Sequence, residues 1–314
     1  MLDALAIVLE KPEHIALSRL AITSPEPDDV VVQTLWSGVS SGTERLLFTG
    51  RMPHFPGMGY PLVPGYESVG LVTHAGPDAH VREGEMVFVP GARCFGEVRG
   101  LFGGAASRLV SKASRVIPVP EWLEDRAILF ALAATAHHAR VGAVEGGGEL
   151  IVGHGVLGRL LARLSVLAGG EPPTVWEKNP ARIHGAQAYQ VMSPDDDPRR
   201  NYRTIYDVSG DSGILDTLVQ RLAPGGEVVL AGFYDVSLHF SFPPAFMREA
   251  RFRVAAEWKE PDIKAIKGLV ESGALSLDGL ISHHSPASSA ASAYPTAFHD
   301  PSCLKMVLDW SALS

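Results

Sequence analysis

The sequence predicts a two-domain α/β protein, with a β-rich first domain and a second domain built on a doubly wound parallel sheet. Residues 1–120 contain short strand-like runs separated by Gly and Pro, a pattern typical of β structure. Between residues 121 and 272, short apolar strands alternate with segments of helical periodicity. That alternation indicates a parallel sheet with helices on both faces. Residues 273–314 are rich in Ser and Ala, and we expect them to return and pack on the first domain.

The strands of the first domain are expected where β-branched residues cluster. The Val-containing runs 30–32, 68–72 and 86–89 are separated by segments with Gly and Pro, which favours short strands joined by turns. Segment 57–65 contains too much Gly and Pro for a helix or a central strand. We therefore predict an ordered loop there.

The second domain is expected to alternate regularly between the two kinds of element. Residues 156–168 carry Leu at the spacing of one helix face and end at two glycines, which predicts a helix with a defined stop. The remaining elements follow from similar apolar patterns: strands 149–152, 174–176, 204–208 and 227–230, and helices 214–222 and 261–273. The run 194–200 is polar and charged, and it predicts a surface loop.

Composition excludes several classes of protein. The chain has 314 residues, is 46% hydrophobic and carries a formal net charge of -8, with Lys and Arg scattered rather than clustered. Neither nucleic acid nor an anionic membrane surface is therefore an expected partner. Its two cysteines, Cys94 and Cys303, form no paired motif, which favours a reducing compartment. The first eleven residues do not resemble a signal peptide and no apolar run has membrane-spanning length, so we expect a cytoplasmic protein.

A glycine-rich turn between a strand and a helix predicts a dinucleotide site. Gly153-His154-Gly155-Val156-Leu157-Gly158 has the G-x-G-x-x-G pattern directly after strand 149–152. Gly153 would permit the tight turn, Gly155 would let the backbone approach a pyrophosphate, and Gly158 would let the helix pack close to the strand. The first helical amides, at Val156 and Leu157, would then face the phosphates. The alternative is an ordinary strand-to-helix turn.

An acidic residue in the right place predicts NAD as the cofactor. Glu177 follows the second strand, 24 residues after Gly153, where a carboxylate would bind the adenosine ribose hydroxyls and repel a 2′-phosphate. Lys178 and Arg182 stand close by and weaken this preference. We include Lys178 among the cofactor-binding residues.

Three motifs in order resemble the medium-chain dehydrogenase/reductase superfamily. They are Gly38–Glu44 (GVSSGTE), Pro64–Gly70 (PGYESVG) and the glycine fingerprint. The resemblance covers essentially the whole chain. It implies a GroES-like first domain that carries the catalytic groups and a Rossmann-type second domain that binds the nucleotide. Relatives commonly dimerise through the second domain, so the resemblance also implies a homodimer.

The zinc-binding residues of that superfamily are missing from the matching positions. Zinc-dependent members have a Cys where this chain has Ser40 or Ser41, and a His where it has Tyr66. The third ligand would fall near residues 132–133, which are Leu and Ala, and the structural zinc site is reduced to Cys94. Because catalytic zinc needs about three protein ligands, we predict that no metal binds. A different site built from scattered histidines is the alternative.

Without zinc, side chains must hold the substrate alcohol and accept its proton. The resemblance implies that candidates for this work lie at the matching positions Ser41, Thr43, Tyr66 and Glu67, with His137 as a further base or substrate ligand. Each has a plainer alternative: Glu67 as a structural ion pair, Tyr66 as a packing aromatic, and His137 as a helix-capping or solvated residue. Thr135 is expected near the nicotinamide carboxamide.

Longer phrases match a narrower group within the superfamily. Residues 52–66, 99–106, 132–139 and 151–161 are similar to zinc-free members that oxidise a hydroxyethyl group on a chlorophyll-type tetrapyrrole. This resemblance implies a broad, flat, mostly apolar substrate. Apolar residues on Gly-rich loops of the first domain are candidates to bind it, although ordinary core packing is the alternative for each. They are Phe48, Met52, Phe55, Met58, Tyr60 and Phe102.

Two other functions remain open from the sequence. A zinc-free quinone or enone reductase of the same superfamily also lacks the metal ligands, but such enzymes usually favour NADPH, and Glu177 argues against that. A noncatalytic NAD-binding sensor would also combine an intact fingerprint with a lost zinc site. The polar set Thr43, Tyr66, Glu67 and Thr135 argues against a sensor.

Overall fold

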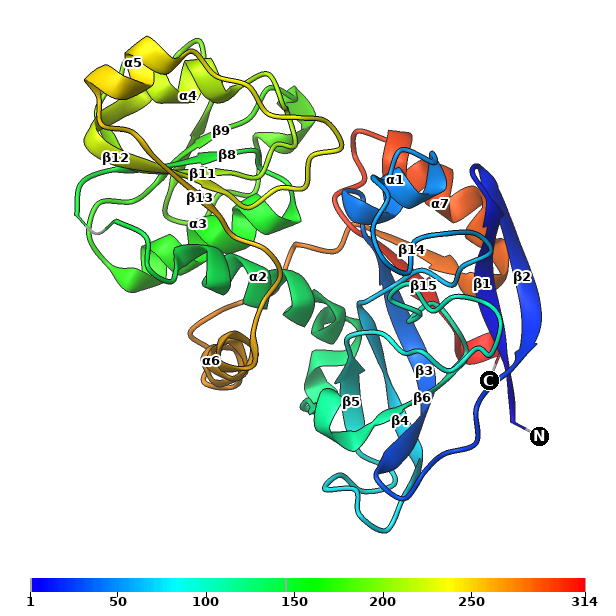
Figure 1. Ribbon diagram of the computed structural model, residues 1–314. Coiled ribbons are helices and arrows are strands. Elements are labelled where there is room, and N and C mark those ends of the chain that lie inside the picture. Colours follow the sequence, from blue (N-terminus) through cyan, green and yellow to red (C-terminus); the bar gives the residue numbers. More distant parts are fainter. Residues whose placement is uncertain (1, 145, 314) are drawn as a thin grey trace. The chain divides into compact units, whose positions relative to one another are not determined.

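The computed structural model describes residues 2–144 and 146–313, and the chain divides into two units (Figure 1). Unit 1 comprises the chain up to Ala131 and from Ile281 onward, and unit 2 comprises Leu132–Leu280. These boundaries lie beyond residues 120 and 272, where the sequence suggested them. The reason in unit 1 is that the 3-10 turns Glu121–Leu129 pack on its sheet, and the Phe130 ring lies 6.2 Å from that of Phe88.

Unit 1 is built from a seven-stranded sheet and a two-stranded one. The larger sheet has the order β14-β15-β3-β4-β5-β7, with β6 also paired to β3, and β1 pairs with β2. The strands are β1 (Asp3–Lys11), β2 (His14–Ala21), β3 (Asp29–Val39), β4 (Ser68–Ala75), β5 (Met86–Val89), β6 (Arg108–Lys112), β7 (Ile117–Pro118), β14 (His283–Pro286) and β15 (Met306–Asp309). Two helices belong to this unit, α1 (Thr43–Phe48) and α7 (Ala290–His299).

The C-terminal segment completes the core of unit 1. Strand β15 pairs antiparallel with β3, so residues more than 260 positions apart lie side by side. The indole nitrogen of the fully buried Trp310 donates to Ser37 Oγ at 2.9 Å. Because a buried indole N–H needs a partner, this hydrogen bond ties the end of the chain to the central strand.

Unit 2 contains a six-stranded sheet with the order β10-β9-β8-β11-β12-β13. All of its recorded strand pairs are parallel. The strands are β8 (Glu149–Val152), β9 (Thr174–Trp176), β10 (Gln190–Met192), β11 (Tyr202–Asp207), β12 (Leu222–Leu230) and β13 (Arg251–Val254), and the helices are α2 (Phe130–Arg140, whose first two residues lie in unit 1), α3 (Val156–Ala168), α4 (Leu215–Arg221), α5 (Phe242–Met247) and α6 (Glu260–Glu271). The chain leaves β8 toward β9 on one side and later adds β11 on the other, so a topological switch point lies between β8 and β11. Ligands of such sheets bind at this point, outside the carboxyl ends of the strands.

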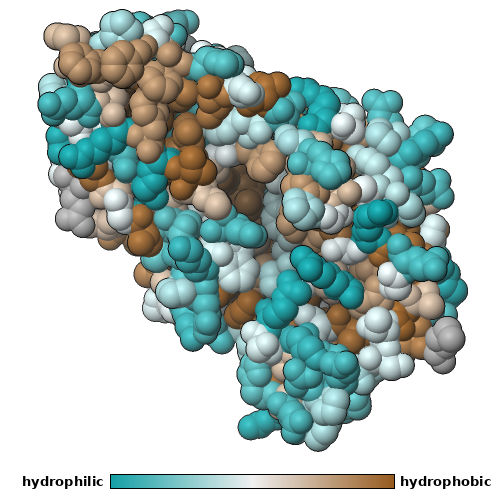
Figure 2. All heavy atoms as spheres, viewed as in Figure 1, coloured by the Kyte–Doolittle hydropathy of each residue, from teal (hydrophilic) through white to brown (hydrophobic). Residues whose placement is uncertain are grey.

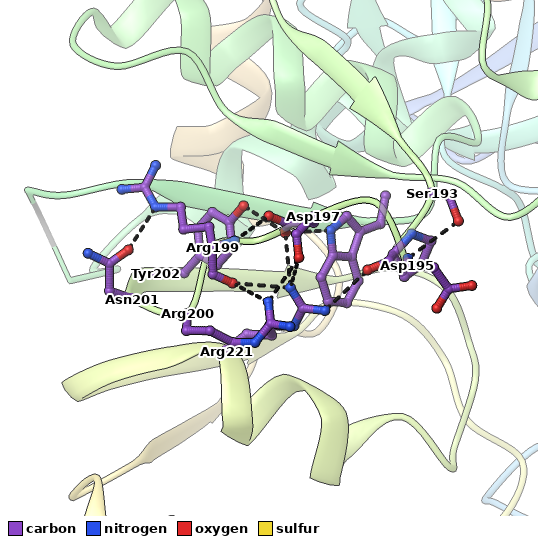
Figure 3. Close-up of polar contacts among 10 residues, drawn as sticks. Ser193, Asp195, Asp197, Arg199, Arg200, Asn201, Tyr202 and Arg221 are labelled. Atoms are coloured by element: carbon purple, nitrogen blue, oxygen red, sulfur yellow. Dashed lines mark hydrogen bonds and ion pairs between the residues drawn. The ribbon is translucent and has the colours of Figure 1, made fainter.

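The polar run 194–200 is not simply a surface loop, as the sequence suggested, because Asp197 is buried within it. The Asp197 carboxylate accepts hydrogen bonds from Trp176 Nε1 at 2.8 Å, the Tyr202 hydroxyl at 2.9 Å and the Arg199 backbone N–H at 2.8 Å. The Arg221 guanidinium lies 3.6 Å away, and the Arg221 side chain points toward the Asp197 carboxylate (Figure 3). A buried charge needs such partners, and composition alone does not reveal them.

Within the described part of the chain, no helix is both long and apolar enough to cross a membrane.

Candidate active site

The glycine turn of unit 2 has the geometry of a phosphate-binding turn. Gly153 has a φ of +107°, which favours glycine, and its N–H donates to Trp176 O at 2.9 Å. A Cβ on Gly158 would lie 1.9 Å from Gly153 O, so only glycine allows helix α3 to approach this closely. A Cβ on Gly155 would meet nothing within 4 Å, and no side chain caps α3. The uncapped first turn therefore faces open space, which fits a dinucleotide pyrophosphate.

Glu177 lies directly at this turn. Its Oε2 accepts the His154 backbone N–H at 3.0 Å and its Oε1 accepts the Asn179 N–H at 2.7 Å. Each carboxylate oxygen can accept further hydrogen bonds, so the orientation is fixed while capacity for ribose hydroxyls remains. Lys178 is largely exposed, and its ammonium lies 3.5 Å from Asp211 Oδ2.

His154, the variable residue inside the fingerprint, is a buried structural residue. Its ring nitrogens contact Arg182 O at 2.5 Å and the Tyr189 hydroxyl at 2.8 Å. Burial lowers the pKa of His154 to about 4, so the ring is neutral near pH 7. It therefore adds no charge to the phosphate-binding turn.

His137 and His138, at the end of α2, share one carboxylate. Their Nδ1 atoms lie 2.8 and 2.9 Å from the two oxygens of Asp262, which is buried in the first turn of α6. Burial raises the pKa of Asp262, but hydrogen bonds from His137, from the Lys259 backbone and from His138 outweigh it and hold that pKa below its usual value. The pair braces α2 against α6 within unit 2. Thr135 lies two residues before His137 on α2 and is half-buried.

Unit 1 contains a buried group of acidic, basic and hydroxyl side chains, which we call the carboxylate cluster. Its members come from five places: the end of β3, helix α1, the segment before β4, helix α7 and the segment before β15. The members are Ser40, Glu44, Tyr66, Glu67, Tyr294 and Lys305, all of them buried except the half-buried Tyr66.

Tyr66 holds the half-buried edge of the cluster. Its hydroxyl donates to Ser40 Oγ at 2.7 Å, and Thr43 is a second hydrogen-bond partner. Its ring lies edge-on to Phe102, with centroids 5.1 Å apart, and Phe102 has an unusual positive φ of 67°. Burial, and next the charge of Glu67, raise the pKa of Tyr66, so the phenol stays protonated. Ser40 makes this contact, whereas Ser41 is exposed at the start of α1.

Glu67 is paired with a cation that the sequence analysis missed. Lys305 Nζ lies 2.5 Å from Glu67 Oε2, and both side chains are almost completely buried. The Lys305 ammonium also donates to Val39 O at 3.3 Å. A Cβ on Gly38 would lie 2.2 Å from Glu67 Oε2, so the first glycine of the GVSSGTE motif makes room for the carboxylate.

Glu44 and Tyr294 were also missed. Glu44 Oε1 accepts the Ser40 backbone N–H at 3.1 Å, and Oε2 accepts the Tyr294 hydroxyl at 2.9 Å. Burial raises the pKa of Glu44 to about 7. Glu44 belongs to a motif that we had singled out, but Tyr294 and Lys305 carry no local signal and come from the C-terminal return.

The six apolar residues predicted to bind substrate lie in one cluster of unit 1. Phe48 and Met52 are buried in it, together with residues of α1 and of the loops. Phe55, Met58, Tyr60 and Phe102 are partly buried against the same cluster, and the Tyr60 hydroxyl donates to Leu47 O. This packing favours a core role for the first two, while the other four keep some exposed surface.

Among residues 2–144 and 146–313, no three His, Cys, Asp or Glu side chains are grouped so that they could hold a metal ion.

Comparison with known proteins identifies the class. Residues 26–121 match the family model of the alcohol dehydrogenase GroES-like domain. The fold is similar to that of an Escherichia coli alcohol dehydrogenase solved with NADH (TM-score 0.84, 20% identity, 98% of this chain and 99% of that one). It is also similar to L-idonate 5-dehydrogenase from the same species (TM-score 0.86, 17% identity, 98% of each chain). These likenesses show that the chain has the fold of the alcohol dehydrogenases, a GroES-like domain joined to a unit with a parallel sheet.

Two sequence relatives are much more similar. Both are named 2-desacetyl-2-hydroxyethyl bacteriochlorophyllide A dehydrogenase. The one from Rhodobacter capsulatus is 56% identical over 98% of this chain and 99% of its own, and the one from Cereibacter sphaeroides is 55% identical over 98% of each. The chain therefore belongs to this dehydrogenase family within the medium-chain dehydrogenase/reductase superfamily.

Proposed function

We propose that the protein oxidises the 3-hydroxyethyl group of bacteriochlorophyllide a to the 3-acetyl group, late in bacteriochlorophyll a biosynthesis, with NAD as oxidant and without catalytic zinc. The observation that carries this proposal is 56% identity over nearly the full length to a dehydrogenase named for that substrate. The reaction removes a hydride from the carbinol carbon and a proton from the hydroxyl. Bound NAD supplies the hydride acceptor, and the proton must go to the protein or to water.

We propose that the hydroxyl groups of unit 1 hold the substrate alcohol. Tyr66 is the first candidate because its hydroxyl, which donates to Ser40 Oγ, still has an oxygen that can accept from the substrate hydroxyl. Thr43 in α1 and Ser41, two residues before α1, are its neighbours. Glu67 and His137 stay candidates for the proton acceptor, although each already has a close partner, Lys305 and Asp262 respectively. A Tyr66→Phe variant that keeps full turnover would remove Tyr66 from this scheme.

We propose NAD rather than NADP from the position of Glu177. Two backbone N–H groups orient its carboxylate at the glycine turn, where it would accept ribose hydroxyls and repel a 2′-phosphate. The nearest cation in sequence, Lys178, lies against Asp211. In Glu177→Gln we expect the ratio of kcat/KM for NADP to that for NAD to rise about ten-fold, which corresponds to ~1.4 kcal/mol. Glu10→Gln, at an exposed position of β1, should leave the ratio unchanged.

One assay tests the reaction itself. Purified protein treated with a chelator is mixed with NAD and hydroxyethyl bacteriochlorophyllide a. We expect NADH to form together with a red shift of the pigment, because the acetyl group conjugates with the ring. Loss of activity after chelation, restored by a metal ion, would contradict zinc independence. Turnover of a quinone with NADPH, but not of the pigment alcohol, would favour the reductase.

We also propose that the protein forms a homodimer through unit 2. Strand β13 is at the edge of the sheet, and an exposed strand edge can pair with another chain. Beside it, apolar side chains gather over α5 (Figure 2), and Phe242, Phe246 and Met247 are 65–77% exposed. A patch of this kind favours an interface. Light scattering should give twice the chain mass, and Phe246→Glu should give the monomer; a wild-type monomer at all concentrations would exclude the dimer.

A further inference from the structure

The carboxylate cluster contains more acids than bases. Glu44 and Glu67 are both fully buried, and Lys305 supplies a positive charge next to Glu67. Among the described residues, no cation lies within ion-pair distance of Glu44. Two carboxylates and one ammonium in a desolvated space carry an uncompensated negative charge, which a bound proton would neutralise.

The hydrogen bonds of Glu44 show where that proton would bind. Oε1 accepts a backbone N–H, from Ser40, which can only donate. Oε2 is bonded to the Tyr294 hydroxyl, which can donate or accept because its hydrogen rotates. When Glu44 is protonated at Oε2, the Tyr294 hydroxyl can turn and accept, so the hydrogen bond survives with its direction reversed. Protonation at Oε1 would instead bring two hydrogens together.

The groups that face Glu44 shift its pKa in both directions. Burial raises its pKa most, the Ser40 N–H lowers it, and the Glu67 carboxylate raises it again; the Tyr294 hydroxyl and the Lys305 ammonium lower it less. The result is a value of about 7. The pKa of Tyr294 lies well above its normal value because of burial and the Glu44 charge, so Tyr294 itself keeps its proton.

Ser40 connects Glu44 to the proposed substrate-binding hydroxyl. Its backbone N–H donates to Glu44, and its Oγ accepts from Tyr66. A change in the charge of Glu44 therefore alters the bond that holds Ser40, and through Ser40 the position of the Tyr66 hydroxyl.

We propose that Glu44 is a titrating positioning residue: its carboxylate takes up and releases one proton at Oε2 while the Tyr294 hydroxyl reverses its hydrogen bond, and its ionised form holds the Ser40–Tyr66 pair for alcohol oxidation. The inference rests on the proposed function for its catalytic half and on the cluster geometry for its titrating half.

The titrating half is tested without substrate. Infrared difference spectra of the whole protein, recorded from about pH 5 to about pH 9, should show a buried carboxylic acid that ionises near pH 7. The signal should be absent in Glu44→Gln and unchanged in Glu10→Gln. In Tyr294→Phe the midpoint should move to higher pH, because the lost hydroxyl favours the ionised form. A signal that persists in Glu44→Gln, or a midpoint unmoved in Tyr294→Phe, would overturn the proposal.

The catalytic half is tested by the pH profile of kcat. In wild type, kcat should fall as the pH is lowered, and the midpoint of this acidic limb should equal the infrared midpoint. In Tyr294→Phe the midpoint of the limb should lie at higher pH. Glu44→Gln should have no acidic limb and should turn over about ten-fold more slowly than wild type. Glu44→Asp, which keeps a carboxylate, should restore a limb. If Glu44→Gln keeps the acidic limb of wild type and the full rate, the catalytic half alone is refuted. If wild type does not oxidise the pigment alcohol, the proposed function is refuted, and the infrared result alone decides whether Glu44 titrates.

Discussion

Asp197 in unit 2 and Glu44 in unit 1 are both buried carboxylates. Each accepts a hydrogen bond from a tyrosine hydroxyl, Asp197 from Tyr202 and Glu44 from Tyr294, but their other partners differ. Asp197 accepts from the Trp176 indole and the Arg199 backbone, which are groups that can only donate, and Arg221 lies 3.6 Å away (Figure 3). Glu44 has one donor-only partner and one hydroxyl that can reverse.

The difference lies in whether the partners of the carboxylate can reverse their hydrogen bonds. Each oxygen of Asp197 accepts from an N–H group that can only donate. Around Glu44, a proton is accommodated by rotation of one hydroxyl. Burial alone therefore does not reveal the role of a carboxylate; the ability of its partners to reverse does.

The largest expected effect is on the structural side of this comparison. Asp197→Asn places an amide N–H₂ against donor-only groups and leaves Arg221 without its counter-charge, so we expect the free energy of unfolding to fall by about 3 kcal/mol. Denaturant titration measures it. The matched control is Asp195→Asn, an exposed carboxylate two residues away, which should change stability by less than ~0.5 kcal/mol. Equal stability of the two variants would refute the structural role of Asp197.

The same charge removal at Glu44 should have the opposite sign. The pKa of Glu44 is raised from 4.5 to about 7 in the folded chain, so the folded state binds the proton more tightly than the unfolded state. Its contribution to stability is therefore lost as pH rises from about 4.5 to about 7. The stability of Glu44→Gln should not fall with pH in this way, because glutamine does not ionise. Above pH ~7 we expect the variant to be more stable than wild type by about 2 kcal/mol, with little difference near pH ~4. Denaturation at both pH values measures it, and a destabilised variant at the higher pH would contradict the assignment.

The smallest effect comes from the two tyrosine hydroxyls. Tyr202→Phe removes one of several donors to Asp197 and should lower stability by about 1 kcal/mol. Tyr294→Phe should lower it by a similar amount, but it should also move the pH dependence of stability to higher pH. An unmoved pH dependence in Tyr294→Phe would contradict the role assigned to Glu44.

The sequence was most informative where a function follows from neighbouring residues. The strand 149–152, the helix 156–168 and the glycine turn between them were predicted, and the structure has β8 and α3 with these same bounds. Glu177 was found because the distance from turn to second strand is nearly constant in such sheets. Periodicity and local spacing are properties of a short segment, so one sequence contains them completely.

The carboxylate cluster could not be assembled in this way. Glu44 and Tyr294 are 250 residues apart, and the ammonium that pairs with Glu67 comes from Lys305, near the end of the chain. Asp197 was misjudged for the related reason that a polar run looks the same whether or not its partners bury it. Both cases depend on tertiary contacts that periodicity does not encode.

The return of the chain to unit 1 has a consequence for biosynthesis. Unit 2 is continuous in sequence, but unit 1 needs β14 and β15 from the last residues to complete its sheet. On the ribosome, unit 2 is therefore free to fold first, while unit 1 waits until β14 and β15 have been synthesised. A nascent chain stalled before residue 281 would have its dinucleotide turn but lack Lys305, the partner on which the buried acid Glu67 depends.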